Sequence, residues 1–119
     1  MKSVDFAVRR KAYVTKLEES VQRMVKVLSR LPEVERVILF GSYARGRRDL
    51  LTDLDILVVM DTRLDILART TFIYEQLFLP VDYDVLVYTP LELERWKEQP
   101  FLRQILEEGK VLYEKKSQR

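Results

Sequence analysis

The sequence predicts an α/β (α+β) fold in which helices pack on a small mixed β-sheet. Three short apolar segments, at residues 37–40, 53–60 and 81–88, have the length and composition of buried strands. The segments between and around them repeat apolar residues every three or four positions, which is typical of amphipathic helices. The chain can bury one core, and no linker or repeat divides it, so we expect a single domain over residues 1–119.

The composition excludes several kinds of chemistry. The chain is 47% hydrophobic and 34% charged, and its net charge of +2 is too small to indicate nucleic-acid binding by itself. It has no cysteine and no histidine, which excludes disulfides, thiol nucleophiles, Ser-His triads and His/Cys zinc sites. Any metal must be held by oxygen, which favours Mg²⁺ or Mn²⁺. No segment resembles a signal peptide or a membrane span, so we expect a cytoplasmic protein.

The first helix is expected at about residues 4–30. Pro32 ends it, because proline restricts the residue before it and cannot continue the hydrogen-bond ladder. Its apolar positions are Tyr13, Leu17, Val21, Met24, Val25 and Leu28. We interpret this helix as the cover of one face of the sheet.

The stretch from Val37 to Met60 contains the main functional signal. Its first strand ends at Phe40 and is followed by Gly41 and Ser42, where a short helical turn can begin. Glycine has no Cβ, so the backbone there can turn sharply and approach a ligand closely. Backbone N–H groups at such a turn suit phosphate oxygens, so we expect a phosphate-binding turn at this point.

The second strand opens with Asp53 and Asp55. Successive strand side chains alternate between faces, so these two carboxylates share one face. If this strand is the antiparallel neighbour of the first, the carboxylates lie at the same end of the sheet as Gly41 and Ser42. Two adjacent negative charges need a cation, which predicts a metal site beside the phosphate-binding turn.

A second helix is expected at about residues 64–78, with Asp61 or Thr62 as its cap. Its length of about 22 Å matches that of a seven-residue strand, so it can return the chain to a parallel third strand at residues 81–88.

The third strand carries two more carboxylates, Asp82 and Asp84, again two residues apart. Because a crossover returns the chain to the same end of the sheet, one of them can reach the cation site formed by Asp53 and Asp55. The residues alone leave the choice between Asp82 and Asp84 open.

The remaining chain is expected to form two short helices and an edge strand. We expect a helix over residues 91–98, which Thr89 caps and in which Pro90 takes the first helical position. A further helix runs from Pro100 to Gly109, and residues 110–114 form the edge strand.

These motifs together resemble the signature of the minimal nucleotidyltransferases, small stand-alone members of the DNA polymerase beta superfamily. The matching residues are Gly41-Ser42-Tyr43-Ala44-Arg45-Gly46, Thr52-Asp53-Leu54-Asp55 and Asp84 before Thr89-Pro90. The likeness covers a catalytic core from about residue 34 to 90. A Gly-Ser pair alone is a weak signal, whereas this combination at this spacing is specific. Thr52 stands where the family usually has serine, and either hydroxyl would serve.

The resemblance implies a Mg²⁺-dependent nucleotidyltransferase that moves a nucleoside monophosphate, foremost AMP from ATP, to a hydroxyl. Asp53 and Asp55 would bind two Mg²⁺ ions, with Mn²⁺ as the alternative. The third aspartate would bind the metal beside the attacking hydroxyl. Asp84 fits that role better than Asp82, because it lies inside the apolar strand and has the family's spacing to Thr-Pro.

The resemblance also assigns residues to the nucleotide. Gly41 and Ser42 would hold the phosphates of ATP or another nucleoside triphosphate. From the residues themselves, Arg45, Arg47 and Arg48 are further candidates for contact with a triphosphate or RNA, although basic loop residues are usually only solvated. We interpret Trp96, Phe101 and Tyr113 as core or interface residues rather than base-stacking platforms.

A partner is implied as well. Small members of this family commonly pair with a helical HEPN protein in a toxin–antitoxin system, in which the nucleotidyltransferase is the antitoxin. Because 119 residues leave little beyond the catalytic core, such a partner or a second copy of the chain would complete the cleft. Two alternatives remain: an antitoxin that neutralises its partner by contact without turnover, and a nucleic-acid-binding adaptor, which the modest charge disfavours.

Overall fold

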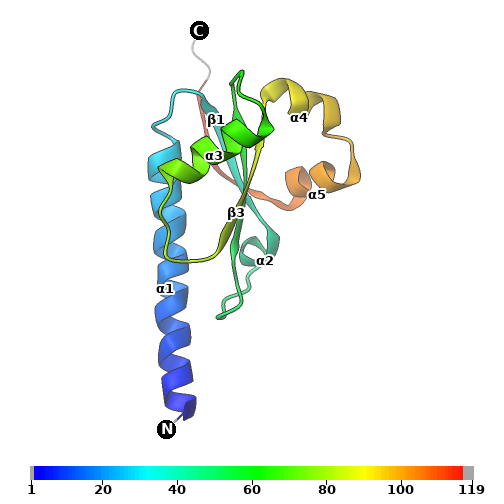
Figure 1. Ribbon diagram of the computed structural model, residues 1–119. Coiled ribbons are helices and arrows are strands. Elements are labelled where there is room, and N and C mark those ends of the chain that lie inside the picture. Colours follow the sequence, from blue (N-terminus) through cyan, green and yellow to red (C-terminus); the bar gives the residue numbers. More distant parts are fainter. Residues whose placement is uncertain (1, 117–119) are drawn as a thin grey trace.

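The computed structural model describes residues 2–116, with side chains from residue 5 onward, and has the mixed α/β architecture that the sequence predicts (Figure 1). In chain order the elements are α1 (Lys2–Leu28), β1 (Val34–Phe40), α2 (Gly41–Ala44), β2 (Leu54–Met60), α3 (Ile66–Gln76), β3 (Tyr83–Tyr88), α4 (Pro90–Trp96), α5 (Pro100–Glu108) and β4 (Lys110–Glu114). Within residues 2–116, none of the helices combines the length and the hydropathy that a membrane span requires.

The four strands form one sheet in the order β3-β2-β1-β4. β1 is antiparallel to both β2 and β4, whereas β2 and β3 are parallel. The parallel pair requires a crossover, which α3 supplies, as predicted. The predicted edge strand at residues 110–114 is also confirmed. This topology brings the end of β1 and the beginnings of β2 and β3 to the same edge of the sheet.

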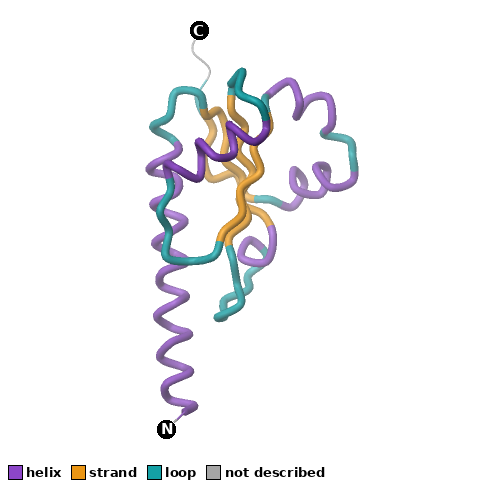
Figure 2. Tube along the Cα trace, viewed as in Figure 1, coloured by secondary structure: helices purple, strands orange, loops and turns teal. Residues whose placement is uncertain are grey.

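Helices cover both faces of the sheet (Figure 2). On one face, α1 and α3 pack over a core that includes Ile56 and Val58 of β2. On the other, α4 and α5 pack over Leu57 and Val59. β2 is therefore buried on both faces, which explains its nearly continuous apolar sequence. Asp55 interrupts that sequence and shares the face of Leu57, since side chains two apart project alike.

Helix α1 packs on one face of the sheet from Tyr13 onward. The residues that pack there include Leu17, Met24 and Leu28, which are fully buried. Residues 5–12 are exposed, and Figure 1 shows this end of the helix extending past the sheet. The helix ends at Leu28, before the predicted boundary, because hydrogen-bonded turns over residues 29–34 connect it to β1.

The cap of α3 differs from the prediction. Asp65, rather than Asp61 or Thr62, is the N-cap, and its Oδ1 accepts a hydrogen bond from Ala68 N at 2.8 Å. The backbone N–H of Asp61 donates instead to the carbonyl oxygen of Glu33 at 2.8 Å, which extends the pairing of β1 and β2. Asp61 therefore takes part in strand pairing, and α3 begins after Asp65, the next aspartate whose side chain can cap a helix.

An ion pair links α3 to α4 beside the edge strand β3. The side chain of Arg69 is only 7% exposed, and its two terminal nitrogens contact the carboxylate of Glu92 at 2.6 and 3.2 Å. Glu92 also completes the predicted cap of α4, because its carboxylate accepts from Thr89 N while Thr89 Oγ1 accepts from Glu92 N. One carboxylate therefore both starts α4 and fixes its position relative to α3.

Candidate functional site

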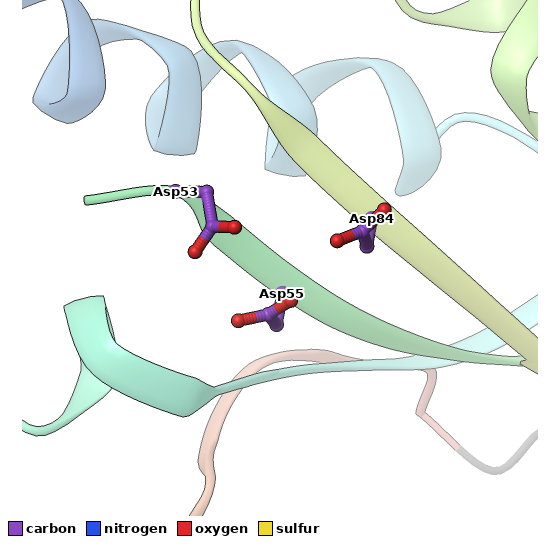
Figure 3. A group of neighbouring side chains, drawn as sticks. All are labelled: Asp53, Asp55 and Asp84. Atoms are coloured by element: carbon purple, nitrogen blue, oxygen red, sulfur yellow. The ribbon is translucent and has the colours of Figure 1, made fainter. Parts of the chain in front are cut away.

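Three carboxylates meet where β2 and β3 begin (Figure 3). Asp53 immediately precedes β2, Asp55 lies within it, and Asp84 lies on β3. One carboxylate oxygen of each lies within 4.8 Å of the others. Asp55 and Asp84 are register partners on the parallel strands, so their side chains project from the same face of the sheet. The structure thus brings together the three aspartates that we predicted as metal ligands.

The structure also separates Asp84 from Asp82. Asp82 precedes β3, and its backbone carbonyl accepts a hydrogen bond from Leu54 N at 3.0 Å. Its side chain is exposed and does not belong to the acidic group formed among the described residues. Strand pairing therefore selects Asp84, the aspartate that the resemblance favoured.

The electrostatics of the group favour a bound cation. The pKa of Asp55 is raised to about 6, first by partial burial and then by the negative charges of Asp53 and Asp84, while the positive charge of Arg45 opposes the shift. Carboxylate oxygens at this separation suit a hard divalent cation. Such an ion would remove the repulsion among the three aspartates, so the residues present fit a divalent metal.

Gly41 lies directly against the acidic group. Its φ is +80°, a conformation that residues with a Cβ rarely adopt. A Cβ at this position would also overlap Oδ2 of Asp55 and lie 3.0 Å from its Cγ. Two independent constraints therefore require glycine here. The close approach places the turn leading into α2 in contact with the carboxylates, as the sequence predicts.

The short helix α2 begins at this turn. Gly41 and Ser42 are its first residues, and no side chain caps its N-terminus. A helix start has backbone N–H groups without partners inside the helix. Oxygen atoms of a phosphate can therefore be accommodated beside the acidic group.

The three arginines of the following loop differ in their contacts. The guanidinium of Arg48 lies 3.4 Å over the ring of Tyr43 and donates to that residue's carbonyl oxygen at 2.8 Å. Arg47 forms an ion pair with Asp49 at 2.8 Å. Arg45 is exposed and makes no side-chain hydrogen bond or ion pair with any residue that the structure describes. Of the three, Arg45 is the one available to a ligand.

The loop before Asp53 is held by contacts that the sequence did not predict. Thr52 is 1% exposed, and its hydroxyl donates to Oδ1 of Asp49 at 3.0 Å. The hydroxyl of Tyr13 on α1 donates to the backbone carbonyl of Thr52 at 2.8 Å. Burial raises the pKa of Tyr13, so its hydroxyl remains a donor. Within an amphipathic stripe, nothing in the local sequence distinguishes this tyrosine from an ordinary core residue.

Comparisons with known proteins agree with this geometry. Residues 22–118 match the model of the family described as "Polymerase beta, Nucleotidyltransferase". A protein of Methanocaldococcus jannaschii named "Putative protein adenylyltransferase MJ0604" is 37% identical over 84 residues, which cover 67% of this chain and 79% of that protein.

Solved structures show the same fold. A mutant of the toxin–antitoxin MntA–HpeT is 25% identical with a TM-score of 0.55, over 83% of this chain and 73% of that chain. A Sulfolobus solfataricus protein described as a "putative nucleotidyltransferase" is 26% identical with a TM-score of 0.52, over 84% of this chain and 88% of that chain. As its sequence motifs indicate, this chain belongs to the polymerase beta nucleotidyltransferase family and is a nucleotidyltransferase.

Proposed function

We propose that this chain is a Mg²⁺-dependent adenylyltransferase that transfers AMP from ATP to a hydroxyl group of a protein. The observation that carries the proposal is the group of three carboxylates, with oxygens within 4.8 Å of one another, beside the turn at Gly41. The name of the Methanocaldococcus jannaschii relative supports adenylate as the transferred group and a protein as its acceptor.

The acidic residues have distinct roles in this proposal. Asp53 and Asp55 would hold two Mg²⁺ ions, and Asp84 would contribute a further carboxylate to one of them. When bound, the ions supply charge neutralisation for the triphosphate and activation of the acceptor hydroxyl. Asp84 is the most exposed of the three, so an incoming hydroxyl approaches the site over β3.

The turn at the end of β1 holds the phosphates. Gly41 allows the backbone to approach them, Ser42 offers its N–H and hydroxyl, and Arg45 adds a positive charge. The acceptor oxygen forms a bond to the α-phosphorus, and the bond between that phosphorus and the β-phosphate oxygen breaks. The hydroxyl proton passes to a carboxylate of the acidic group, and pyrophosphate leaves.

The proposed acceptor is a partner protein, and the partner a helical HEPN-type toxin that this chain restrains as the antitoxin. A toxin–antitoxin among the similar structures supports this reading. The first turns of α1 leave surface open to such a partner, because residues 5–12 are exposed on the part of the helix that extends past the sheet (Figure 1).

The experiment incubates the complex, co-purified with its partner, with Mg²⁺ and ATP labelled on the α-phosphate. We expect labelled AMP on the partner. Asp53→Asn and Asp55→Asn should each lower the labelling rate at least about 100-fold, since each removes charge stabilisation of several kcal/mol. Asp82→Asn is the matched control, because it removes a nearby carboxylate outside the acidic group and should leave labelling unchanged.

The contact-only alternative makes the opposite prediction. If the wild-type complex takes up no label, and the Asp53→Asn/Asp55→Asn double variant still suppresses the toxicity of the partner, the chain acts by binding and the enzymatic proposal is wrong.

A further inference from the structure

A small apolar pocket of about 190 Å³ adjoins the acidic group on the side of β1. Its walls come from the end of β1, the start of α2 and one side of α5. The apolar lining residues are Phe40, Ala44, Phe101 and Ile105. Arg45, Gln104 and Glu108 also line it, and all three are exposed. The pocket therefore combines an apolar interior with polar groups that are open to solvent.

This pocket is continuous with the proposed catalytic site. Gly41 lines the pocket and also lies against the carboxylate of Asp55. Phe40, another lining residue, is the register partner of Asp55 across β1 and β2. A ligand whose phosphates lie at Gly41 and Asp55 can therefore extend into the pocket without crossing another element.

The lining matches one part of a nucleotide. Phosphates and ribose are polar, so the flat base is the part that an apolar pocket can receive. Phe101 is 55% exposed, and its ring packs edge to face on Phe40, with centroids 6.4 Å apart and planes at 87°. This arrangement leaves the Phe101 ring accessible for stacking. The exposure of Phe101 also shows that, of the predicted core and interface roles, the core role is wrong for this residue.

The polar groups narrow the choice of base. The amide of Gln104 carries both a donor and an acceptor, which is the pattern that pairs with N6 and N7 of adenine. The carboxylate of Glu108 can accept a hydrogen bond from an exocyclic amine and would repel a phosphate. Gln104 favours adenine over guanine, whose O6 and N7 are both acceptors at the corresponding edge, whereas Glu108 can accept from the exocyclic amine of either base.

The strand order argues against the acceptor as the occupant. The acceptor hydroxyl is proposed to approach over Asp84 on β3, whereas the pocket lies beside β1. β2 separates these two strands in the sheet. The acceptor and the pocket are therefore on opposite sides of the proposed metal site.

We propose that the pocket formed by Phe40, Ala44, Phe101, Gln104 and Ile105 is the subsite for the adenine base of ATP, with Phe101 as its stacking surface. This inference rests on the proposed nucleotidyl-transfer site. The acidic group and the turn at Gly41 contact only phosphates and metal, so the pocket supplies the preference for one base. Gln104 is the residue that sets the preference.

The test measures equilibrium binding of ATP, GTP and inorganic tripolyphosphate in the presence of Mg²⁺, by calorimetry on the full chain. Tripolyphosphate has the phosphates without the base. Phe101→Ala should weaken ATP binding about 5- to 100-fold, the range expected for one lost stacking contact, and leave tripolyphosphate binding unchanged. Gln104→Ala should lower the ratio of ATP to GTP affinity roughly tenfold.

Two further variants control for folding and for unspecific loss of apolar surface. Phe101→Tyr retains the stacking ring and should bind ATP as the wild type does. Leu91→Ala removes an apolar side chain that is 69% exposed on α4, outside the pocket, and should leave all three affinities unchanged.

The outcomes separate this inference from the proposed function. If ATP binds no more tightly than tripolyphosphate, or if Phe101→Ala weakens both alike, the base subsite is wrong while the transferase stands. If Phe101→Ala changes only the KM for the acceptor, the pocket serves the acceptor and the inference is equally wrong. If the wild type binds neither ATP nor tripolyphosphate, both proposals fail together.

Discussion

The carboxylate of Asp55 occupies the space that a side chain at position 41 would need. Asp55 lies on β2, and Gly41 starts α2 directly after the neighbouring strand β1. The contact joins the turn proposed to hold phosphates to the carboxylates proposed to hold metal. A nucleotide bound at the turn would therefore lie within reach of the metal site without any movement of the chain.

Gly41→Ala tests this contact. The new Cβ would displace the Asp55 carboxylate in addition to straining the backbone at φ +80°. We expect transfer activity to fall at least about 100-fold and the free energy of unfolding to fall by about 1–3 kcal/mol. Labelling assays and urea titration measure the two effects.

Gly46→Ala is the matched control for that experiment. Gly46 also has a positive φ, +106°, but a Cβ there would have no atom within 4 Å. It should therefore lose similar stability and retain most of the activity. Equal loss of activity in both variants would mean that backbone strain, rather than contact with Asp55, explains the effect.

Asp55→Asn should stabilise the metal-free protein while it destroys the metal response. Asp55 is partly buried beside two like charges, so replacing its charge with a neutral amide removes an unfavourable interaction. We expect the melting temperature in EDTA to rise by a few degrees. We also expect the increase that Mg²⁺ produces in the wild type to disappear.

Thermal melts of wild type, Asp55→Asn and Asp82→Asn, each with EDTA or Mg²⁺, check this prediction. Asp82→Asn should keep the response to Mg²⁺, because Asp82 lies outside the acidic group. A lower melting temperature for Asp55→Asn in EDTA would contradict the electrostatic argument.

Tyr13→Phe should affect catalysis from a distance. The change removes the hydroxyl that donates to the buried carbonyl of Thr52, next to Asp53. We expect a loss of about 1 kcal/mol in the free energy of unfolding, and a several-fold lower kcat with a higher Mg²⁺ requirement.

Tyr83→Phe distinguishes positioning from general stability. The Tyr83 hydroxyl donates to the backbone carbonyl of Leu77 at 3.2 Å, so the same atom is lost from a different segment. Its free energy of unfolding should fall by a comparable amount while kcat and the Mg²⁺ requirement remain as in the wild type. Identical kinetics of Tyr13→Phe and Tyr83→Phe would exclude a positioning role for Tyr13.

The ion pair of Arg69 and Glu92 should make stability depend on pH in the acid range. The hydrogen bond from Arg69 lowers the pKa of Glu92 below its ordinary value of 4.5. The ionised carboxylate is favoured in the folded state, so its contribution is present above pH 4.5 and is lost as the pH falls through the lower folded pKa. Glu92→Gln should cost about 2 kcal/mol at pH 7 and reduce the pH dependence of stability below pH 4.5.

Glu107→Gln is the corresponding control, because it breaks an ion pair with Arg103 in which both side chains are more than 60% exposed. Its free energy of unfolding should change by less than about 0.5 kcal/mol. Urea titrations of both variants between pH 3 and pH 7 measure the difference. A Glu92→Gln variant with the pH dependence of the wild type would contradict the assigned pKa shift.

The sequence by itself determined the order of the elements and the pairing of Asp53 with Asp55, whereas the strand register decided that Asp84 rather than Asp82 joins them. Asp53 and Asp55 share a face because strand side chains alternate, and the crossover helix brings β3 back to the same edge of the sheet. Both rules act over short distances along the chain or follow from chain connectivity. The same holds for Thr89 and Pro90, whose roles at the start of α4 depend only on adjacent residues.

Only the tertiary structure decided which side chains from distant parts of the chain contact one another. The bond from Tyr13 to Thr52 joins residues 39 positions apart, and the ion pair of Arg69 and Glu92 joins residues 23 positions apart. The pocket beneath Phe101 likewise exists only because α5 packs next to the end of β1. Such contacts depend on how whole elements pack together, and local periodicity carries no information about the side chain that will face a given residue across the core.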